Sequence, residues 1–128
     1  MNELEGKIVS QVLMNDDNTV IVFKTDTGEQ IVYEAQGDCC SESWFSGIVG
    51  LGSLLGQQVI EVTERPEIGD LKSERQEFDI LYGYFIKTKD GVIEIEFRNA
   101  SNGYYGGWCE RWSGVLDTMT LHGVTGDF

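Results

Sequence analysis

Alternating apolar and polar residues, separated by short turns, dominate the first part of the chain. Residues 7–14 and 19–24 flank the turn sequence Asn15-Asp16-Asp17-Asn18, and residues 29–35 follow Thr25-Asp26-Thr27-Gly28. Alternation with a period of two is typical of half-buried strands, and these turn residues allow the chain to reverse. The pattern therefore predicts a three-stranded antiparallel meander.

A helical spacing replaces this alternation in the next segment. The apolar residues that share the spacing are Trp44, Ile48, Leu51 and Leu55. Ser41 or Ser43 can cap a helix that begins there. The glycines at 47, 50, 52 and 56 each weaken a helix by about 1 kcal/mol relative to alanine. We therefore expect two short helices here in preference to one long helix.

The second half of the chain again predicts strands, which occupy residues 58–65, 78–87, 92–98, 104–112 and 115–121. Pro66 ends the first of them, and Asp90-Gly91 is a strong hairpin signal. In the run 92–98 three apolar residues alternate with three charged ones, so one face of that strand is expected to be buried. The whole pattern predicts a single α+β domain, residues 1–128, with a twisted antiparallel sheet of about six to seven strands, a meander plus hairpins, packed on one or two short helices.

The net charge of the chain restricts the possible functions more than any other compositional feature. The 128 residues include 22 acidic and 9 basic ones, for a formal net charge of −13. Such a field repels phosphate backbones, so direct nucleic-acid binding is not expected. Two interpretations of the acidity stay open, namely solubility and a surface that imitates nucleic acid to occupy a basic groove on another protein. The longest mostly apolar run, residues 44–55, is far shorter than the ~20 residues that cross a bilayer.

The three cysteines do not form a conventional disulfide framework, because two of them are adjacent. Asp38, Cys39, Cys40 and Ser41 lie at the junction between a strand and the expected helix, where a thiol pKa can be lowered. A cysteine nucleophile needs a base, and the one histidine is distant, so we interpret these four residues as a structural junction. The candidate zinc ligands have the wrong spacing, and neither a metal nor a cofactor is expected; they are Cys39, Cys40, Cys109 and His122.

The segment from Arg98 to Trp108 combines a guanidinium, amide side chains, glycines and aromatic rings. These groups suit a nucleotide pocket, since rings stack on a base, an amide reads its edge and an arginine binds phosphate. A tight turn whose aromatic residues fill the core is an equally open interpretation. The candidate ligand-binding residues are Trp44, Arg98, Asn99, Asn102, Tyr104, Tyr105, Trp108 and Arg111. If they form one pocket, Asp38 and Trp44 lie beside the second segment.

Four sequence segments carry a resemblance to known proteins. They are GDCCSESW at residues 37–44, IEIEFRN at 93–99, SNGYYGG at 101–107 and VTGDF at 124–128. Together they resemble an uncharacterised family of small domains encoded by phages. That family brings no established activity with it. The sequence also lacks a P-loop, a dinucleotide fingerprint and a nucleophile elbow, so we expect no enzyme.

The resemblance implies a phage accessory protein that acts by binding, with counter-defence as its role and the cytoplasm of the infected host cell as its place. The first hypothesis is that it sequesters a cyclic nucleotide defence signal, as Thoeris anti-defence proteins do. The alternative is an acidic inhibitor of the anti-CRISPR type, which binds a nuclease effector by mimicking nucleic acid. A phage structural or regulatory protein is the third possibility. The expected partner is thus a host defence component, either a small nucleotide or a nuclease protein, and the protein itself could form a homo-oligomer.

Overall fold

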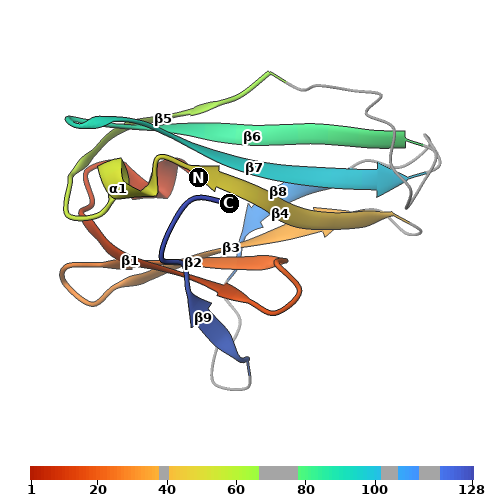
Figure 1. The fold of residues 1–128 in the computed structure, drawn as a ribbon, viewed down its shortest axis with the longest axis horizontal. Coiled ribbons are helices and arrows are strands. Elements are labelled where there is room, and N and C mark those ends of the chain that lie inside the picture. The colour runs from red at the N-terminus through yellow and green to blue at the C-terminus, as the bar shows by residue number, and fades with distance from the viewer. Residues whose placement is uncertain (38–40, 67–77, 102–106, 113–118) are drawn as a thin grey trace.

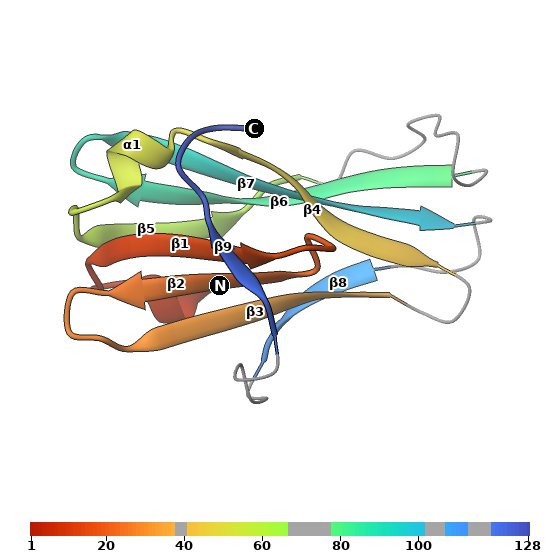
Figure 2. The same ribbon diagram turned by 60° about the horizontal axis from the view of Figure 1, so that its bottom comes forward.

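Two antiparallel sheets that pack face to face make up the fold (Figures 1 and 2). The computed structural model describes residues 1–37, 41–66, 78–101, 107–112 and 119–128, with the backbone alone for 78, 79, 101 and 107. The elements are η1 (Asn2–Leu4), β1 (Val9–Asn15), β2 (Val20–Thr25), β3 (Gln30–Gly37), β4 (Glu42–Val49), α1 (Leu51–Leu54), β5 (Val59–Glu64), β6 (Phe78–Thr88), β7 (Gly91–Ser101), β8 (Gly107–Arg111) and β9 (Leu121–Gly123).

The first sheet contains the predicted meander, which the structure confirms. Its strand order is β8-β3-β2-β1-β9, so β8 and β9 flank the three N-terminal strands. In the β1–β2 turn the side-chain oxygen of Asn15 accepts hydrogen bonds from the backbone N–H groups of Thr19 and Val20. The turn is closed at Asn18, which has a φ of 58°. An asparagine tolerates this left-handed conformation better than most residues. The turn could therefore be predicted from the residue types at positions 15–18.

The second sheet has the order β4-β7-β6-β5 and is built on the predicted hairpin of β6 and β7. Both strands contain 11 residues, and their register closes with Thr88 opposite Gly91, at the Asp90-Gly91 signal. Ile93, Ile95 and Phe97 of β7 are buried between the sheets, whereas Glu94, Glu96 and Arg98 are half-buried on the opposite face. We call this opposite face of the second sheet the outer face.

The prediction of two short helices over residues 44–55 is wrong for most of that range. Residues 42–49 form β4, which pairs with β7, and the helix is limited to the four residues of α1. A bulge between Phe45 and Gly47 shifts the register, so that Phe45 and Ile48 both enter the core although they are three residues apart. A bulged strand can therefore imitate the spacing of a helix. Ser43 caps no helix and instead donates a hydrogen bond to the backbone oxygen of Gln36.

The fold class also needs correction, because nine strands in two sheets and one short α-helix, within the described residues, make the protein mainly β. The expected single sheet of six to seven strands is therefore split. The main core lies between the sheets, where Phe23 packs edge-on against Tyr33 and Phe45 against Phe97. A smaller apolar cluster lies on the other face of the first sheet and is formed by Val20, Val22 and Val32, with Leu13, Trp112, Met119 and Leu121 packed against it.

The C-terminal residues connect the two sheets. The backbone N–H of Val124 donates to Val12 of the first sheet, and Phe128 exchanges two backbone hydrogen bonds with Ile48 of the second. Between these contacts, the carboxylate of Asp127 accepts hydrogen bonds from the backbone N–H groups of Gly50 and Leu51, where α1 begins. This carboxylate supplies the helix cap that the sequence pattern assigned to a serine.

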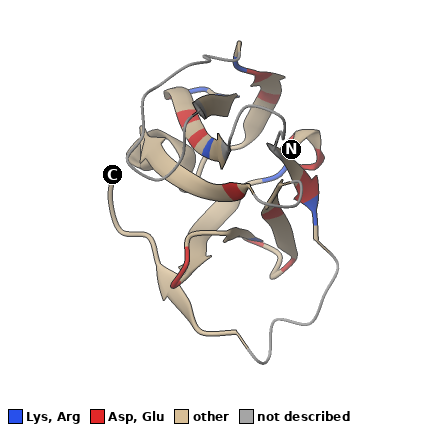
Figure 3. Ribbon diagram, turned by 90° about the vertical axis from the view of Figure 1, so that its right-hand side faces the viewer, with Lys and Arg blue, Asp and Glu red and all other residues tan. Residues whose placement is uncertain are grey.

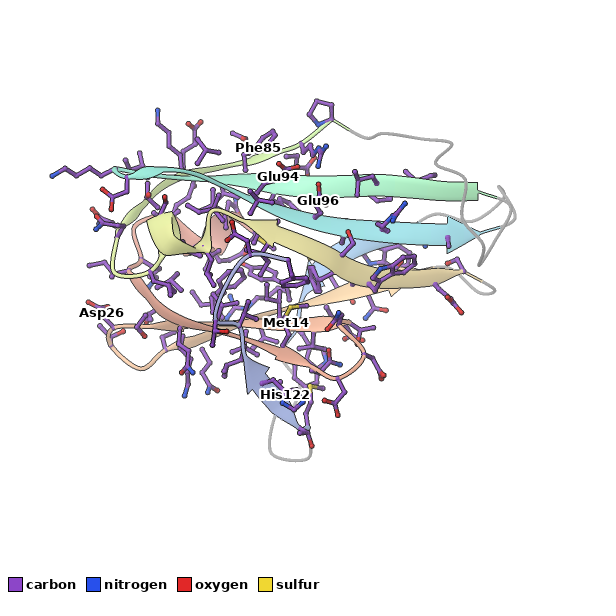
Figure 4. The ribbon with its side chains drawn as sticks, in the orientation of Figure 1. Met14, Asp26, Phe85, Glu94, Glu96 and His122 are labelled. Atoms are coloured by element: carbon purple, nitrogen blue, oxygen red, sulfur yellow. The ribbon has the colours of Figure 1, made fainter. Side chains whose placement is uncertain are left out.

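The cap predicts a pH-dependent stability. The hydrogen bonds from Gly50 and Leu51 lower the pKa of Asp127 below its ordinary value. A lowered pKa means that the stabilisation is present above the ordinary aspartate pKa of about 4 and is lost as pH falls through the folded-state value. Asp127→Ala is therefore expected to lower the melting temperature at neutral pH, and the difference from the native protein should narrow in acid. Thermal unfolding between neutral and acidic pH measures this, with Asp26→Ala at the exposed turn after β2 as the control (Figure 4). A pH-independent difference would contradict the capping role.

Candidate functional site

The two segments singled out in the sequence lie side by side. The first segment runs along the end of β3 and the start of β4, and the second runs along the end of β7 and the start of β8. The predicted adjacency of Trp44 to the second segment is therefore present, while Asp38 lies outside the described residues. The register partners are Ser43 with Asn99, Trp44 with Arg98, Gln36 with Trp108 and Gly37 with Gly107.

Adjacent backbones do not bring the predicted side chains into one pocket, because neighbouring residues of a strand point to opposite faces. Trp44 and Arg98 share the outer face, where the Arg98 guanidinium carbon lies 6.0 Å from the centroid of the Trp44 ring. Asn99 points the other way and is fully buried. Trp108 and Arg111 belong to β8 in the other sheet. Asn102, Tyr104 and Tyr105 lie outside the described residues, as do Cys39 and Cys40.

Asn99 is the centre of a buried polar cluster with Ser41 and Ser43, which we call the polar knot. The side-chain nitrogen of Asn99 donates to the hydroxyl of Ser41 over 3.1 Å and to that of Ser43 over 2.9 Å. Gly37 packs directly against the knot, since a Cβ atom at this position would lie 2.5 Å from the Ser41 hydroxyl. The hydrogen bonds of the polar knot connect β3, β4 and β7 at the point where the chain passes from the first sheet to the second. Ser41 and Asn99 therefore hold neighbouring strands together, and the junction predicted at Ser41 leads from β3 to a strand, β4, and not to a helix.

A separate pocket opens where β5 ends, between the inner face of the second sheet and β8. Its volume is about 560 Å³. We call it the aromatic pocket, and it is lined by Glu64, Arg65, Pro66, Tyr82, Gly83, Tyr84, Phe97, Trp108 and Cys109. Among the described candidates from the sequence, Trp108 is the one that contributes to it. The described ligand-binding candidates are thus dispersed: Trp44 and Arg98 lie on the outer face, Asn99 in the polar knot, Trp108 at this pocket and Arg111 at the end of β8.

Three stacked rings form one wall of the aromatic pocket. The Tyr82 and Phe97 rings are nearly parallel, with centroids 5.0 Å apart, and the Tyr84 ring lies 6.1 Å from Phe97. Phe97 and Tyr84 are buried, whereas 41% of Trp108 is exposed on β8. The indole nitrogen of Trp108 donates to Glu110 over 3.1 Å, which orients the ring. Such rings offer flat apolar surface on which another planar group can stack.

The Tyr84 hydroxyl and the Cys109 thiol are uncharged groups of the aromatic pocket. Burial raises the pKa of the Cys109 thiol to about 12, and burial likewise raises the pKa of the Tyr84 hydroxyl. Both side chains therefore stay protonated at neutral pH. Cys109 is therefore a poor nucleophile, because the reactive form of a cysteine is the thiolate. The pocket offers ring surface and neutral hydrogen-bonding groups, with no activated nucleophile among the described residues.

Arg65 is the one cation among the described residues that line the pocket, and two carboxylates on the outer face of the second sheet bind its guanidinium. Arg65 extends from the end of β5 across Gly83, and its guanidinium is hydrogen-bonded to both Glu94 and Glu96 of β7. The Arg65 side chain is 17% exposed, and the two carboxylates are 26% and 28% exposed. Figure 4 shows Glu94 and Glu96 together on the second sheet, beside Phe85, the register partner of Glu94.

Comparison with known proteins identifies the family. Residues 2–110 match the family described as Domain of unknown function (DUF7448). The chain belongs to this family. It is similar to "Uncharacterized protein L278" of Acanthamoeba polyphaga mimivirus, with 37% identity over 106 residues that cover 80% of this chain and 84% of that protein. No solved structure matches the chain. The comparisons thus support an uncharacterised family with a viral member, which is the coarser part of the expectation. The matched range contains every residue that lines the aromatic pocket.

Sequence reasoning missed most of the aromatic pocket of this DUF7448 domain. Tyr82, Tyr84 and Phe97 were assigned to strands without a site, and Arg65 was placed at the end of a strand. One signal was available, since a glycine between two tyrosines inside a strand marks a close approach of another group. That group is Arg65, whose side-chain carbon Cδ would lie 3.1 Å from a Cβ atom at Gly83.

A second hollow of the DUF7448 domain lies on the side of the β1–β2 turn and β4. It has a volume of about 660 Å³ and is lined by Asp16, Asp17, Asn18, Thr19, Glu42, Ser43 and Trp44. Acidic positions are spread over both sheets in the view of Figure 3, and this hollow is one place where several of them surround an aromatic ring. We call it the acidic hollow.

The candidate zinc set does not converge in the described part of the domain. Cys109 lies on β8 and His122 on β9, at opposite edges of the five-stranded sheet, so they cannot share one tetrahedral ion. The histidine instead contacts Asp16 in the β1–β2 turn. Among the described residues, no helix has the length and apolar character to span a membrane.

Proposed function

We propose that this DUF7448 domain is a non-enzymatic binding protein that holds a small planar molecule in the aromatic pocket. The observation that carries the proposal is the wall of stacked Tyr82, Phe97 and Tyr84 rings in a pocket whose lining also includes the partly exposed Trp108. The pocket volume of about 560 Å³ falls within the range of about 300–1,000 Å³ that is typical of ligand pockets. Stacking on aromatic side chains contributes about 1–3 kcal/mol per base in nucleic-acid-binding proteins.

The biological role that we propose is that of a viral accessory protein, and specifically one that sequesters a base-bearing defence signal in the cytoplasm of the infected host cell. The mimivirus relative supports the viral part of this proposal. The phage origin and the cyclic nucleotide remain predictions from the sequence. The predicted ligand set changes, however, because Arg98 lies on the outer face and Asn99 is bonded within the polar knot, while Trp108 lines the aromatic pocket.

The acidic inhibitor of a nuclease effector stays as the second candidate. The acidic hollow supports it, because Asp16, Asp17 and Glu42 surround Trp44 at a site that a lysine or arginine side chain of a basic protein could enter. The third candidate, a structural or regulatory role in the virus, requires neither the aromatic pocket nor the acidic hollow. The first two candidates use different tryptophans, which allows one experiment to separate them.

Trp108→Ala is expected to weaken binding of the planar ligand about tenfold or more, because the variant removes a stacking surface. A panel of nucleosides, nucleotides and cyclic nucleotides is screened by thermal shift, since a ligand that binds only the folded state raises its melting temperature. The affinity of each hit is then measured by calorimetry. Trp44→Ala is the matched control and should bind as the native protein does. Loss of binding in Trp44→Ala alone would move the site to the outer face, and the absence of any hit would refute the proposed function.

A further inference from the structure

The aromatic pocket extends to the edge of the first sheet. The residues that this sheet contributes to the pocket are Trp108 and Cys109, and both belong to β8. β8 is the end strand of its sheet, and among the described strands none pairs with the side of β8 that faces away from β3. Because consecutive residues of a strand point to opposite faces, a pocket that touches two of them lies along the edge of the strand. The backbone of β8 is therefore part of the pocket wall.

The pairing of β8 with β3 determines where its backbone groups point. The N–H of Trp112, directly after β8, donates to the backbone oxygen of Val32 over 2.9 Å. In an antiparallel pair, hydrogen-bonded positions alternate with positions whose N–H and C=O groups point away from the partner strand. In the register of these two strands, the N–H and C=O groups of Cys109 therefore point away from β3. Its register partner Ala35 agrees with this, since the Ala35 N–H donates to Thr19 on the other side of β3.

The edge of β8 thus presents a hydrogen-bond donor beside an acceptor at Cys109. A neighbouring strand uses such a pair when it adds to the edge of a sheet. A planar heterocycle can bind the same two groups if its rim has an acceptor next to an N–H donor, and the edges of nucleobases have this pattern. Stacking accepts every base because each has a flat face, so hydrogen bonds at the edge are what distinguish one ring from another.

The two walls of the pocket therefore supply different parts of one binding mode. The second sheet provides the ring surface of Tyr82, Phe97 and Tyr84. The first sheet provides the backbone edge at Cys109. Burial keeps the thiol of Cys109 neutral, so no thiolate competes with its backbone N–H for the ligand.

We infer that the ligand of the proposed function is a heterocycle with an acceptor and an N–H donor on adjacent atoms, and that the backbone of Cys109 binds this edge. The Cys109 N–H donates to the acceptor atom of the ring, and the Cys109 carbonyl oxygen accepts from the ring N–H. The inference rests on the proposed function and narrows it, since a ring that lacks the donor can stack in the pocket but binds less tightly.

Matched nucleosides test the ligand class by calorimetric titration of the native protein. Inosine, uridine and adenosine are compared with their N1-methyl, N3-methyl and N6-dimethyl derivatives, respectively, because methylation removes the N–H donor and keeps the ring. At least one parent nucleoside is expected to bind about tenfold tighter than its derivative. Equal affinities within every pair, or failure of all three parents to bind, would overturn the inference. Failure of the whole nucleotide panel would refute the proposed function as well.

Amide hydrogen exchange measured by NMR locates the contact in the native protein. Arg111 is the internal control, because its N–H also points away from β3 but Arg111 does not line the pocket. With the tightest-binding of the three nucleosides at about ten times its Kd, exchange at Cys109 should slow about tenfold, because only free molecules exchange there. Exchange at Arg111 should change by less than about twofold. Equal protection of both amides, or of neither, would overturn the inference and leave the proposed function standing.

Two proline variants remove the same backbone group at different distances from the pocket. Proline has no N–H and is tolerated at edge positions that do not use this group in the ladder. Cys109→Pro is expected to bind the nucleoside about tenfold more weakly than Cys109→Ala, which also lacks the thiol but keeps the N–H. Arg111→Pro should bind within about twofold of the native protein. Equal binding by Cys109→Pro and Cys109→Ala would contradict the backbone contact, and the exchange measurement decides the case if Cys109→Pro does not fold.

Discussion

Replacing Asn99 by alanine is expected to lower the free energy of unfolding by about 2 kcal/mol, because each net hydrogen bond contributes about 1 kcal/mol and the variant removes two. Both bonds run from the side-chain nitrogen of the fully buried Asn99 to the hydroxyls of the half-buried Ser41 and Ser43. Asn2→Ala on the exposed surface of η1 is the control and should change stability little. Urea denaturation followed by tryptophan fluorescence measures both variants.

Asn99→Asp extends this prediction to a pH dependence of opposite sign from that of Asp127. Burial raises the pKa of an aspartate, so the folded variant binds a proton more readily than the unfolded chain does. Its stability is therefore lowest at neutral and basic pH, by about 3 kcal/mol relative to the native protein, and partly recovers as the pH falls and the side chain becomes neutral. An Asn99→Ala protein of native stability that had lost ligand binding would instead make Asn99 a ligand contact, as the sequence suggested.

Gly83→Ala is the second large effect, and we expect it to lower the free energy of unfolding by about 2 kcal/mol. A Cβ atom at this position would lie 2.7 Å from the backbone oxygen of Ile95 and 3.1 Å from the Cδ atom of Arg65. The backbone oxygen belongs to the neighbouring strand of the sheet and cannot move without disturbing the β6–β7 ladder. The clash also displaces Arg65 from its two glutamates.

Gly52→Ala in α1 is the matched control for this glycine. A Cβ atom there meets no other atom within 4 Å, and alanine favours a helix over glycine by up to about 1 kcal/mol. The two substitutions therefore change stability in opposite directions, which chemical denaturation resolves directly. Equal stability of Gly83→Ala and the native protein would show that β6 and Arg65 can shift, and that Arg65 has no fixed position beside Glu94 and Glu96.

The strands of the meander and of the β6–β7 hairpin could be predicted because the sequence signals that specify them lie within a few residues of each other. Alternating residues, the Asn15–Asn18 turn and the Asp90-Gly91 turn each act over a few positions, and the structure confirms them. The failure at residues 44–49 has an equally local cause. The bulge at Gly47 puts Phe45 and Ile48 on the same face, and no rule of spacing distinguishes this from a turn of helix.

The candidate site was only partly predictable, because strand pairing determines which side chains meet. Trp44 and Arg98 do lie together, and Trp108 does line a pocket. The sequence could not show that Arg98 and Asn99, although adjacent, point to opposite faces of one sheet, with Arg98 on the outer face and Asn99 buried. It also could not show that Arg65 and Glu94, 29 residues apart, are ion-paired.

By itself, the sequence determined the strand-rich character of this DUF7448 domain, its meander, its central hairpin and its strong negative charge, since each depends on composition or on residues close along the chain. Only the tertiary structure decided that the strands separate into two sheets, that Asn99 is buried in a polar knot, and that Tyr82, Tyr84, Phe97 and Trp108 surround one pocket. These features depend on contacts between residues distant in sequence, which are fixed by packing and by the register of the sheets and not by local preference.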